Sequence, residues 1–180
     1  MSGGQEAKKS RLKEPGRQTM NIYRTSLIGV GLAIMMGCQI ANGQSGKQSS
    51  QIERGRYVVM IGGCNDCHTA GYGDIDAKTP EHERLEGDTL GYRGPWGTTY
   101  PTNLRISIGK KTEEQWVRYA KTLKTRPPMP WFNVQAMSDA DLRALYQYVK
   151  SLGVSGKAAP AFVPAGQQPK GQYVLWPGVK

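Results

Sequence analysis

Residues 64–68 read Cys-Asn-Asp-Cys-His, and this stretch is the most informative part of the 180-residue chain. Two intervening residues place the thiols of Cys64 and Cys67 about one helical turn apart, so each can add to one vinyl group of a haem. The imidazole of His68 is then held beneath the iron as its proximal ligand. Because the motif occurs once, the sequence predicts one covalently attached c-type haem.

Other uses of this motif leave residues unexplained. A zinc site needs four ligands, and outside the motif the chain offers only His82 and Cys38. A thioredoxin-like Cys-x-x-Cys belongs near a βαβ pattern, and the sequence shows no such alternation. A plain disulfide gives His68 no role. Haem attachment is the interpretation that uses both cysteines and the histidine.

Residues 1–37 are expected to be a signal peptide. A basic segment precedes an uncharged, mostly apolar run over residues 26–37. That run is shorter than the ~20 residues that a helix needs to cross a bilayer. The basic segment is long for a signal, so Met20 is an alternative start of the translated chain.

Two processing sites compete after the apolar run. Cys38 follows it directly and resembles the lipid-modified cysteine of bacterial lipoproteins, which makes residues 38–50 a lipid-anchored linker. Cleavage after Ala41-Asn42-Gly43 is the alternative and yields a soluble periplasmic protein. The lipoprotein is favoured because it leaves none of the three cysteines as a free thiol. The expected location is therefore the periplasmic face of a bacterial membrane.

Three helices are expected within residues 51–153. The first covers residues 51–63 and leads into the haem motif. The second begins with the capping box Thr112-Glu113-Glu114-Gln115 and stops before Pro127-Pro128. The third begins after Ser138 and stops at Gly153. Residues 69–101 are rich in glycine and lack periodicity, which predicts a long loop wrapped around the cofactor.

A haem iron bound by one histidine takes a second protein ligand or keeps an open site. Met129 lies in Pro-Pro-Met-Pro (residues 127–130), where the prolines stiffen the loop and can hold a thioether against a metal. Met137 is the alternative, although its position just before the last helix also suits a packing residue. His82 is a third candidate, but it lies in a charged run typical of a solvated surface.

This layout resembles the class I cytochrome c family: a helix into Cys64-Asn65-Asp66-Cys67-His68, a middle helix, a Met-Pro loop and a last helix. The resemblance implies an all-α fold, a small domain over residues 51–153 that wraps one haem. It implies that the first and last helices cross near Gly55 and Tyr148. It also implies that Met129, the methionine of the Met-Pro loop, is the distal ligand.

A narrower resemblance rests on Gly94-Pro95-Trp96-Gly97 and Tyr100-Pro101-Thr102-Asn103-Leu104. These stretches are similar to the haem modules of membrane-bound alcohol and sugar-acid dehydrogenase cytochrome subunits, in which Pro-x-Asn-Leu lies along the haem edge. Those subunits usually carry three haem motifs. The resemblance does not include the Pro-rich residues 154–180, which are expected to be extended, either strapped over the domain or loose.

The predicted function is one-electron transfer between redox protein partners, and not catalysis. A haem subunit of a multi-subunit dehydrogenase and an open-site haem enzyme or sensor are the alternatives. The net charge is +10 at pH 7, but no nucleic-acid motif is present, so nucleic acid is not an expected partner. Basic residues between 105 and 126 are instead expected to steer an acidic redox partner. These are Arg105, Lys110, Lys111, Arg118, Lys121, Lys124 and Arg126.

Overall fold

The computed structural model describes residues 45–73 and 78–177. The chain divides into two units, Met1–Ser45 and Gly46–Lys180, and the fold described below is that of the second. The predicted signal peptide, and the predicted lipid anchor at Cys38, lie outside the described residues. Among the helices of the described ranges, none is both long enough and apolar enough to cross a membrane.

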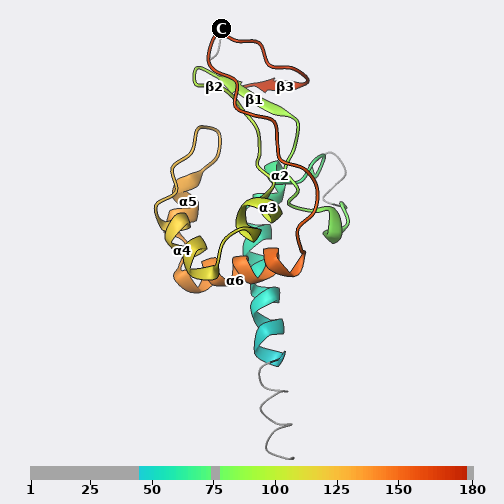
Figure 1. Ribbon diagram of the computed structural model, residues 1–180, viewed down its shortest axis with the longest axis vertical. Helices are drawn as coiled ribbons and strands as arrows, with labels where there is room; N and C mark the ends of the chain where they lie inside the picture. The colour runs from blue at the N-terminus through green and yellow to red at the C-terminus, as the bar shows by residue number, and fades with distance from the viewer. Residues whose placement is uncertain (1–44, 74–77, 178–180) are drawn as a thin grey trace, which may run out of the picture. The chain divides into compact units, whose positions relative to one another are not determined.

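The N-terminal helix (residues 45–61) leads into the short α2 (Cys64–His68), as the sequence predicts. It crosses α6 (Asp139–Ser151) at Gly55 (Figure 1). A Cβ on Gly55 would lie 2.0 Å from the carbonyl oxygen of Ala144 and 2.7 Å from the Cβ of Tyr148. Only glycine permits this approach, so the crossing expected near Gly55 and Tyr148 is confirmed.

The N-terminal helix is longer than predicted. Residues 45–50, which belong to the predicted lipid-anchored linker, continue it and are exposed. The hydroxyl of Ser50 donates to the carbonyl oxygen of Lys47 at 2.8 Å. These residues are helical because a helix that is already nucleated and packed at one end gains a hydrogen bond with each residue added, even when the added residues are polar.

The predicted caps of the two longer helices are confirmed. The side chain of Thr112 accepts from Gln115 N at 3.2 Å, and Thr112 N donates to Gln115 Oε1 at 2.9 Å, so the capping box begins α4 (Glu113–Lys121). Ser138 caps α6 by accepting from Asp141 N at 3.1 Å. α4 stops at Lys121, before the prolines that the sequence suggested as its end, and residues 122–130 form a loop.

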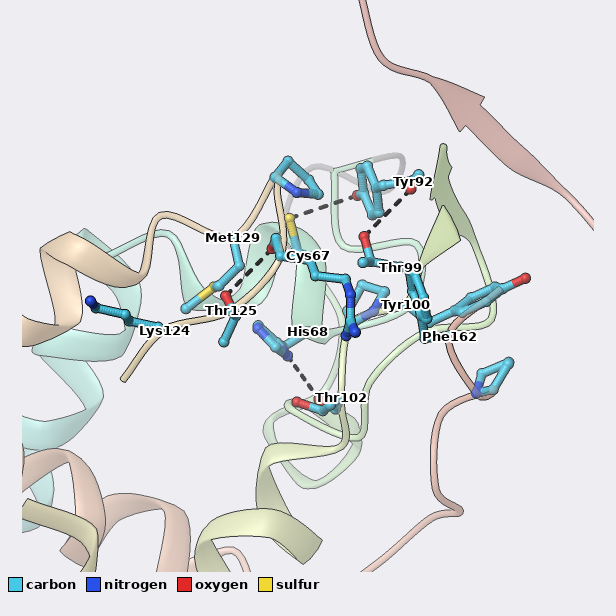
Figure 2. A pocket seen from close by; sticks show the side chains of 14 residues that line it. Cys67, His68, Tyr92, Thr99, Tyr100, Thr102, Lys124, Thr125, Met129 and Phe162 are labelled. Carbon is cyan, nitrogen blue, oxygen red and sulfur yellow. Dashed lines mark hydrogen bonds between the residues drawn. The ribbon is translucent and has the colours of Figure 1, made fainter. Parts of the chain in front are cut away.

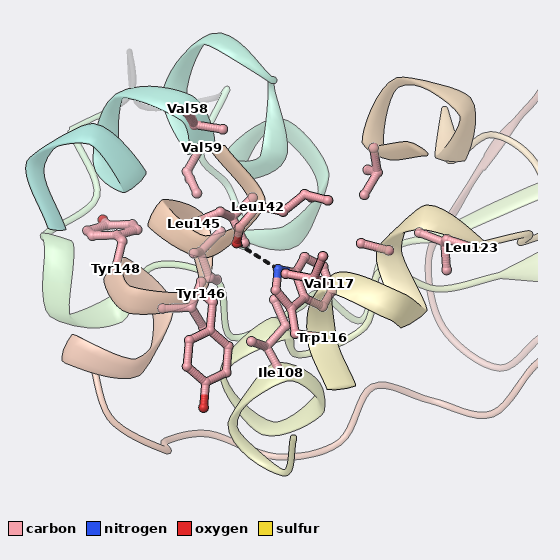
Figure 3. Packing of buried hydrophobic residues seen from close by; sticks show 14 residues of the cluster. Val58, Val59, Ile108, Trp116, Val117, Leu123, Leu142, Leu145, Tyr146 and Tyr148 are labelled. Carbon is pink, nitrogen blue, oxygen red and sulfur yellow. Dashed lines mark hydrogen bonds between the residues drawn. The ribbon is translucent and has the colours of Figure 1, made fainter. Parts of the chain in front are cut away.

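The hydrophobic core lies between the N-terminal helix, α4 and α6 (Figure 3). Trp116 of α4 is at its centre, and its indole N–H donates to the carbonyl oxygen of Leu142 at 2.9 Å. This bond satisfies the one polar atom that the buried tryptophan brings into the core. The other large buried apolar side chains are Val58, Val59, Leu85, Ile108, Val117, Leu123, Val134, Leu142, Leu145, Tyr146, Tyr148 and Val149.

Two short α-helices, and a 3-10 turn at Glu81–Glu83, were not predicted. α3 (Leu104–Gly109) is capped by Asn103, whose side chain accepts from Ile106 N at 3.0 Å. α5 (Trp131–Ala136) begins after Pro130. Each helix has six residues, which is too few for a clear hydrophobic period.

The prediction of an all-α fold is wrong in one respect, because the domain also contains a small sheet. Strands β1 (Gly91–Gly94), β2 (Gly97–Thr99) and β3 (Tyr173–Leu175) lie in the order β2-β1-β3. β1 pairs with β2 antiparallel and with β3 parallel. The first two strands fall in the segment predicted as a loop. They are too short and too rich in glycine to show the alternation that indicates a strand.

The C-terminal tail, residues 154–177 of the described chain, runs back across the domain to reach β1 (Figure 1). Its Val163 exchanges two backbone hydrogen bonds with Thr98, of 2.8 and 3.0 Å. Near the end of the tail, Trp176 packs edge-on against Trp96, with 6.3 Å between the ring centroids. The tail is therefore attached to the β1–β2 hairpin at two separate places.

Candidate haem site

A cavity of about 350 Å³ lies at the end of α2 (Figure 2). Four segments line it: the haem motif, the β1–β2 hairpin with the residues that follow it, the loop after α4, and the tail. One thiol, one imidazole and one thioether lie among aromatic and proline side chains in its walls. The lining residues are Cys67, His68, Tyr92, Thr99, Tyr100, Pro101, Thr102, Lys124, Thr125, Arg126, Pro128, Met129, Pro160 and Phe162.

His68 is buried, with 8% of its surface exposed, and its orientation is fixed by one hydrogen bond. Its Nδ1 lies 2.7 Å from the carbonyl oxygen of Thr102. If Nδ1–H donates, as the carbonyl requires, Nε2 remains for a metal. Burial lowers the pKa of His68, and the bond to Thr102 only partly opposes this effect. The imidazole is therefore held neutral, which is the form that ligates metals.

Gly87 allows Thr102 to come this close to α2. Its N–H donates to the carbonyl oxygen of His68 at 2.8 Å. A Cβ on Gly87 would lie 2.8 Å from both Asn103 N and Pro101 O, and the residue has a φ of 81°. Glycine is the residue that tolerates both conditions. Residues 101–103 therefore pack directly against Gly87, which is hydrogen-bonded to His68. This contact places the carbonyl of Thr102 within reach of the His68 imidazole.

Met129 lines the same cavity as His68 and is half-buried (Figure 2). Its loop is tied to strand β2, because the hydroxyl of Thr99 donates to the carbonyl oxygen of Pro127 at 2.8 Å. The prolines on both sides of Met129 limit its backbone freedom further. The structure therefore brings the imidazole and this thioether to one cavity.

The two other candidates for the distal ligand lie elsewhere. Met137 packs against the core, and its Cε lies 3.4 Å from the position that a Cβ on Gly62 would occupy. His82 has a side chain that is 79% exposed, in agreement with its charged sequence surroundings. Neither residue lines the cavity that contains His68.

The two cysteines of the motif have different surroundings. Cys67 lines the cavity, and the hydroxyl of Tyr92 donates to its Sγ at 3.7 Å. Cys64 packs against the hydrophobic core, and burial, with a smaller contribution from Asp66, raises the pKa of its thiol to about 11. Neither sulfur is in a disulfide, so both cysteines are free thiols.

Several cavity residues were not predicted. Tyr92 and Thr99 come from the hairpin, and Pro160 and Phe162 come from the tail. Pro101 and Thr102 belong to the stretch that the narrower resemblance placed along the haem edge. No clear local pattern marks Tyr92, Thr99 or Pro160, because each reaches the cavity through pairing of distant segments. Phe162 had one weak signal: it is an isolated aromatic residue between two prolines.

Cytochrome c is the family whose model matches this chain, over residues 52–153. The chain belongs to the cytochrome c family. Members of this family bind haem c covalently, and Cys64, Cys67 and His68 fit the Cys-x-x-Cys-His motif through which they do so. Because the motif occurs once, this chain is a monohaem c-type cytochrome.

Relatives of this cytochrome include subunits of several dehydrogenases. It is 31% identical over 121 residues to the cytochrome c subunit of alcohol dehydrogenase (quinone) from Gluconobacter oxydans, which covers 59% of this chain and 23% of that protein. It is 31% identical over 123 residues to a subunit of nicotinate dehydrogenase from Pseudomonas putida, and that match covers 63% of this chain and 10% of that protein. It is 27% identical over 140 residues to the gluconate 2-dehydrogenase cytochrome c subunit from Pantoea cypripedii, and that match covers 71% of this chain and 31% of that protein.

The cytochrome therefore spans between a tenth and about a third of the length of these relatives. No solved structure matches it significantly.

The cavity fits a haem by its chemistry. A haem needs a covalent attachment point, an axial nitrogen and mostly apolar walls, and Cys67, His68 and the aromatic and proline residues supply them. Elsewhere in the described ranges, His, Cys, Asp and Glu side chains do not gather in groups of three or more that could hold a metal ion.

Proposed function

We propose that this cytochrome is a one-electron carrier of the bacterial cell envelope that exchanges electrons with respiratory or dehydrogenase partners and is not itself an enzyme. One observation carries the proposal: His68 and Met129 line a single cavity, and Thr102 holds His68 with one nitrogen left for a metal. A bound haem supplies a one-electron ferric–ferrous couple.

Each site residue has a distinct role in this proposal. Cys64 and Cys67 hold the haem covalently, His68 is the proximal ligand and Met129 is the distal ligand, with Met137 as the alternative. A thioether ligand favours the reduced state and so raises the reduction potential. The bond from Thr99 to Pro127 holds the Met129 loop against strand β2.

The ligand assignment is tested by two methionine variants of the holoprotein. Met129→Ala should abolish the near-infrared sulfur-to-iron charge-transfer band and lower the reduction potential. Met137→Ala is the matched control, because Met137 packs against the core and does not line the cavity. Loss of the band in Met137→Ala alone would assign the ligand to Met137. Rapid binding of carbon monoxide by the unmodified protein would instead favour the open-site enzyme or sensor.

A second candidate function is a haem subunit of a multi-subunit dehydrogenase, and the relatives named above favour it. Co-purification of the cytochrome with a flavin- or quinone-dependent dehydrogenase from its native membrane would support this assembly. Recovery of the cytochrome alone, under conditions that preserve known complexes, would favour an independent carrier.

The basic surface proposed for partner docking is smaller than the sequence suggested. Arg105 is buried, 5% exposed, and its Nη1 lies 3.0 Å from Glu86 Oε1, so it does not belong to that surface. Lys121 pairs with Asp139 at 3.2 Å. Lys124 is exposed and lines the cavity. Arg126 also lines the cavity but stacks on the Phe162 ring, so Lys124 is the residue of this pair that is suited to steer an acidic partner toward the haem.

Steering is tested by the salt dependence of electron transfer to an acidic redox protein. Screening limits surface charges to a reach of about 8 Å at physiological ionic strength, so the association rate should fall as salt rises. Lys124→Glu should slow association at low salt and leave the visible haem spectrum unchanged. Lys47→Glu is a control, because Lys47 lies on the exposed first turns of the N-terminal helix and does not line the cavity. Rates that do not depend on salt would argue against steering.

The location also belongs to this proposal. Lipid modification at Cys38 would anchor the mature protein to the periplasmic face of a membrane. Mass spectrometry of the native protein should then find a diacylglyceryl group on Cys38 at the mature N-terminus. A mature chain that begins at Gln44 would instead indicate a soluble periplasmic protein.

A further inference from the structure

The C-terminal tail contributes part of the wall of the haem cavity. Pro160 and Phe162 line the cavity together with His68 and Met129. The match to the cytochrome c family ends at residue 153, so this part of the wall comes from residues outside the matched region.

Phe162 makes a specific contact with the loop that carries Met129. The guanidinium carbon of Arg126 lies 3.8 Å from the centroid of the Phe162 ring. A planar guanidinium over an aromatic face is attracted by the ring's electrostatic field as well as by dispersion. Arg126 also lines the cavity and lies three residues before Met129 in the chain. The contact therefore joins the tail to the loop at the cavity itself.

Strand β2 holds the backbone on both sides of this contact. Thr98 exchanges two backbone hydrogen bonds with Val163, the neighbour of Phe162. Thr99 donates to the carbonyl oxygen of Pro127, the neighbour of Arg126. A Cβ on Gly97 would lie 2.3 Å from Val163 O, so glycine is needed for the tail to come this close. The two partners of the stack are thus each placed by an adjacent bond to one strand.

We propose that Phe162 and Arg126, together the tail clasp, are positioning residues of the haem site. The tail clasp closes one wall of the cavity and holds the loop in the position from which Met129 would ligate a bound haem. This inference rests on the proposed function, because it assumes a bound haem with Met129 as its distal ligand. Figure 2 shows Phe162 and Met129 at the same cavity, and they come from segments far apart in the chain.

Loss of the tail clasp has consequences that differ from simple loss of stability. A freer loop releases the thioether more often, and exogenous ligands then reach the iron more easily. An opened wall also admits water, which stabilises the more charged ferric state and lowers the reduction potential. Both effects are properties of the folded holoprotein.

The test uses substitutions of Phe162 in the full-length holoprotein. Phe162→Ala should lower the reduction potential and raise the rate of carbon monoxide binding to the ferrous protein several-fold. Phe162→Tyr keeps an aromatic face for Arg126 and should behave like the unmodified protein. Phe162→Leu keeps an apolar side chain without the aromatic face and should lie between the two. Should Phe162→Ala yield no holoprotein, the comparison of Phe162→Leu with Phe162→Tyr replaces it.

The chain offers a matched control. Phe132 is the only other phenylalanine in the sequence. It lies on α5, is 58% exposed and does not line the cavity. Phe132→Ala should therefore leave the potential and the carbon monoxide rate unchanged.

A double-variant cycle tests whether Arg126 acts through Phe162. Arg126→Gln removes a positive charge as well as the stack, so its effect on the potential is not interpretable alone. Adding Arg126→Gln to Phe162→Ala should raise the carbon monoxide rate less than the same change raises it in the unmodified protein. Equal increases in both backgrounds would mean that the two residues act separately, and the tail clasp would then be rejected.

These measurements distinguish failure of the tail clasp from failure of the Met129 ligand assignment. If Phe162→Ala lowers the unfolding temperature but leaves the potential and the carbon monoxide rate unchanged, the tail only supports the fold and the inference is overturned. If Met129→Ala leaves the charge-transfer band intact, the ligand assignment in the proposed function fails. In that case a lowered potential in Phe162→Ala would still support closure of the cavity wall by the tail.

Discussion

The helix crossing at Gly55 and the attachment of the tail hold this domain together by different physics. At the crossing, two backbones come so close that no Cβ fits, and the side chains around it are buried, with Tyr148 and Val149 1% exposed. In the tail, strand β3 is attached by backbone hydrogen bonds, and its side chains stay in solvent, with Leu175 57% exposed. Burial of apolar surface contributes about 25 cal/mol per Å², so the first region supplies stability. The attachment of the tail mainly positions residues of the tail relative to the rest of the domain.

Arg105 joins the two regions. Its buried guanidinium donates to the carbonyl oxygen of Gly153 at 2.7 Å and also to that of Leu152, where α6 ends and the tail begins. It also donates to Glu86 at 3.0 Å and to the carbonyl oxygen of His82. One side chain therefore satisfies the carbonyls of the C-cap residue Leu152 and of Gly153 after it, and so fixes the starting point of the tail.

The helix crossing should give the largest effect. Gly55→Ala places a methyl group 2.0 Å from the carbonyl oxygen of Ala144, so the helices must separate. We expect a loss of about 3 kcal/mol in the free energy of unfolding, at the upper end for overpacked cores. Denaturant unfolding of the holoprotein measures it.

Gly46→Ala is the control for the crossing, because Gly46 lies in the same helix with nothing within 4 Å of its added Cβ. This change should stabilise the protein by up to about 1 kcal/mol through helix propensity. Equal effects of the two substitutions would mean that the crossing is not close-packed.

The junction at Arg105 should give the next largest effect. Arg105→Met keeps much of the side-chain volume but leaves buried carbonyl oxygens and the carboxylate of Glu86 without their donor. We expect a loss of about 2 kcal/mol in unfolding free energy, within the range for buried groups that lose their partners. The exposed Arg118 serves as the control, and Arg118→Met should change stability by less than about 0.5 kcal/mol. An unchanged unfolding free energy in Arg105→Met would show that water replaces these hydrogen bonds.

Two valines compare the regions directly. Val149 in α6 is 1% exposed, whereas Val174 in β3 is 44% exposed. Val149→Ala should cost about 2 kcal/mol, because it removes buried methyl groups and leaves a cavity. Val174→Ala should cost less than about 0.5 kcal/mol. Comparable losses from both substitutions, measured in the same denaturant series, would contradict the division between stability and geometry.

The smallest expected effect is a pH dependence of the unfolding free energy that comes from Tyr148, beside the helix crossing. Burial, together with a hydrogen bond to Glu81, raises the pKa of Tyr148 to about 12 from an ordinary value of 10.0. The folded state therefore retains a proton that the unfolded chain releases. This stability is complete below pH 10 and is lost as the pH rises toward 12. The difference in unfolding free energy between the unmodified protein and Tyr148→Phe should narrow over that interval.

Glu81, the hydrogen-bond partner of Tyr148, makes the unfolding free energy depend on pH in the opposite direction. Burial alone would raise the pKa of Glu81, but hydrogen bonds from Arg56 and Tyr148 outweigh it and lower the pKa below the ordinary 4.5. Stability from this carboxylate is therefore present above pH 4.5 and is lost as the pH falls through the lowered pKa. Glu81→Gln should remove this acid-dependent part, and an unchanged acid transition in that variant would contradict the assignment.

Some features of this cytochrome could be predicted from sequence because they depend on neighbours along the chain. The haem motif and the caps at Thr112 and Ser138 are contacts between residues three or four positions apart, and the structure contains both caps. The crossing at Gly55 is not local, and it was predicted only through resemblance to a family. The placement of His82 in solvent followed from its charged surroundings.

By itself the sequence determined that one haem is attached at Cys64–His68 and that amphipathic helices flank the site. The tertiary structure alone decided that Met129, and not Met137, shares a cavity with His68, that Arg105 is buried, and that the tail reaches the haem site. The reason is physical. Local patterns record contacts within one turn, whereas Thr98 with Val163 and Arg126 with Phe162 meet only after distant segments have paired.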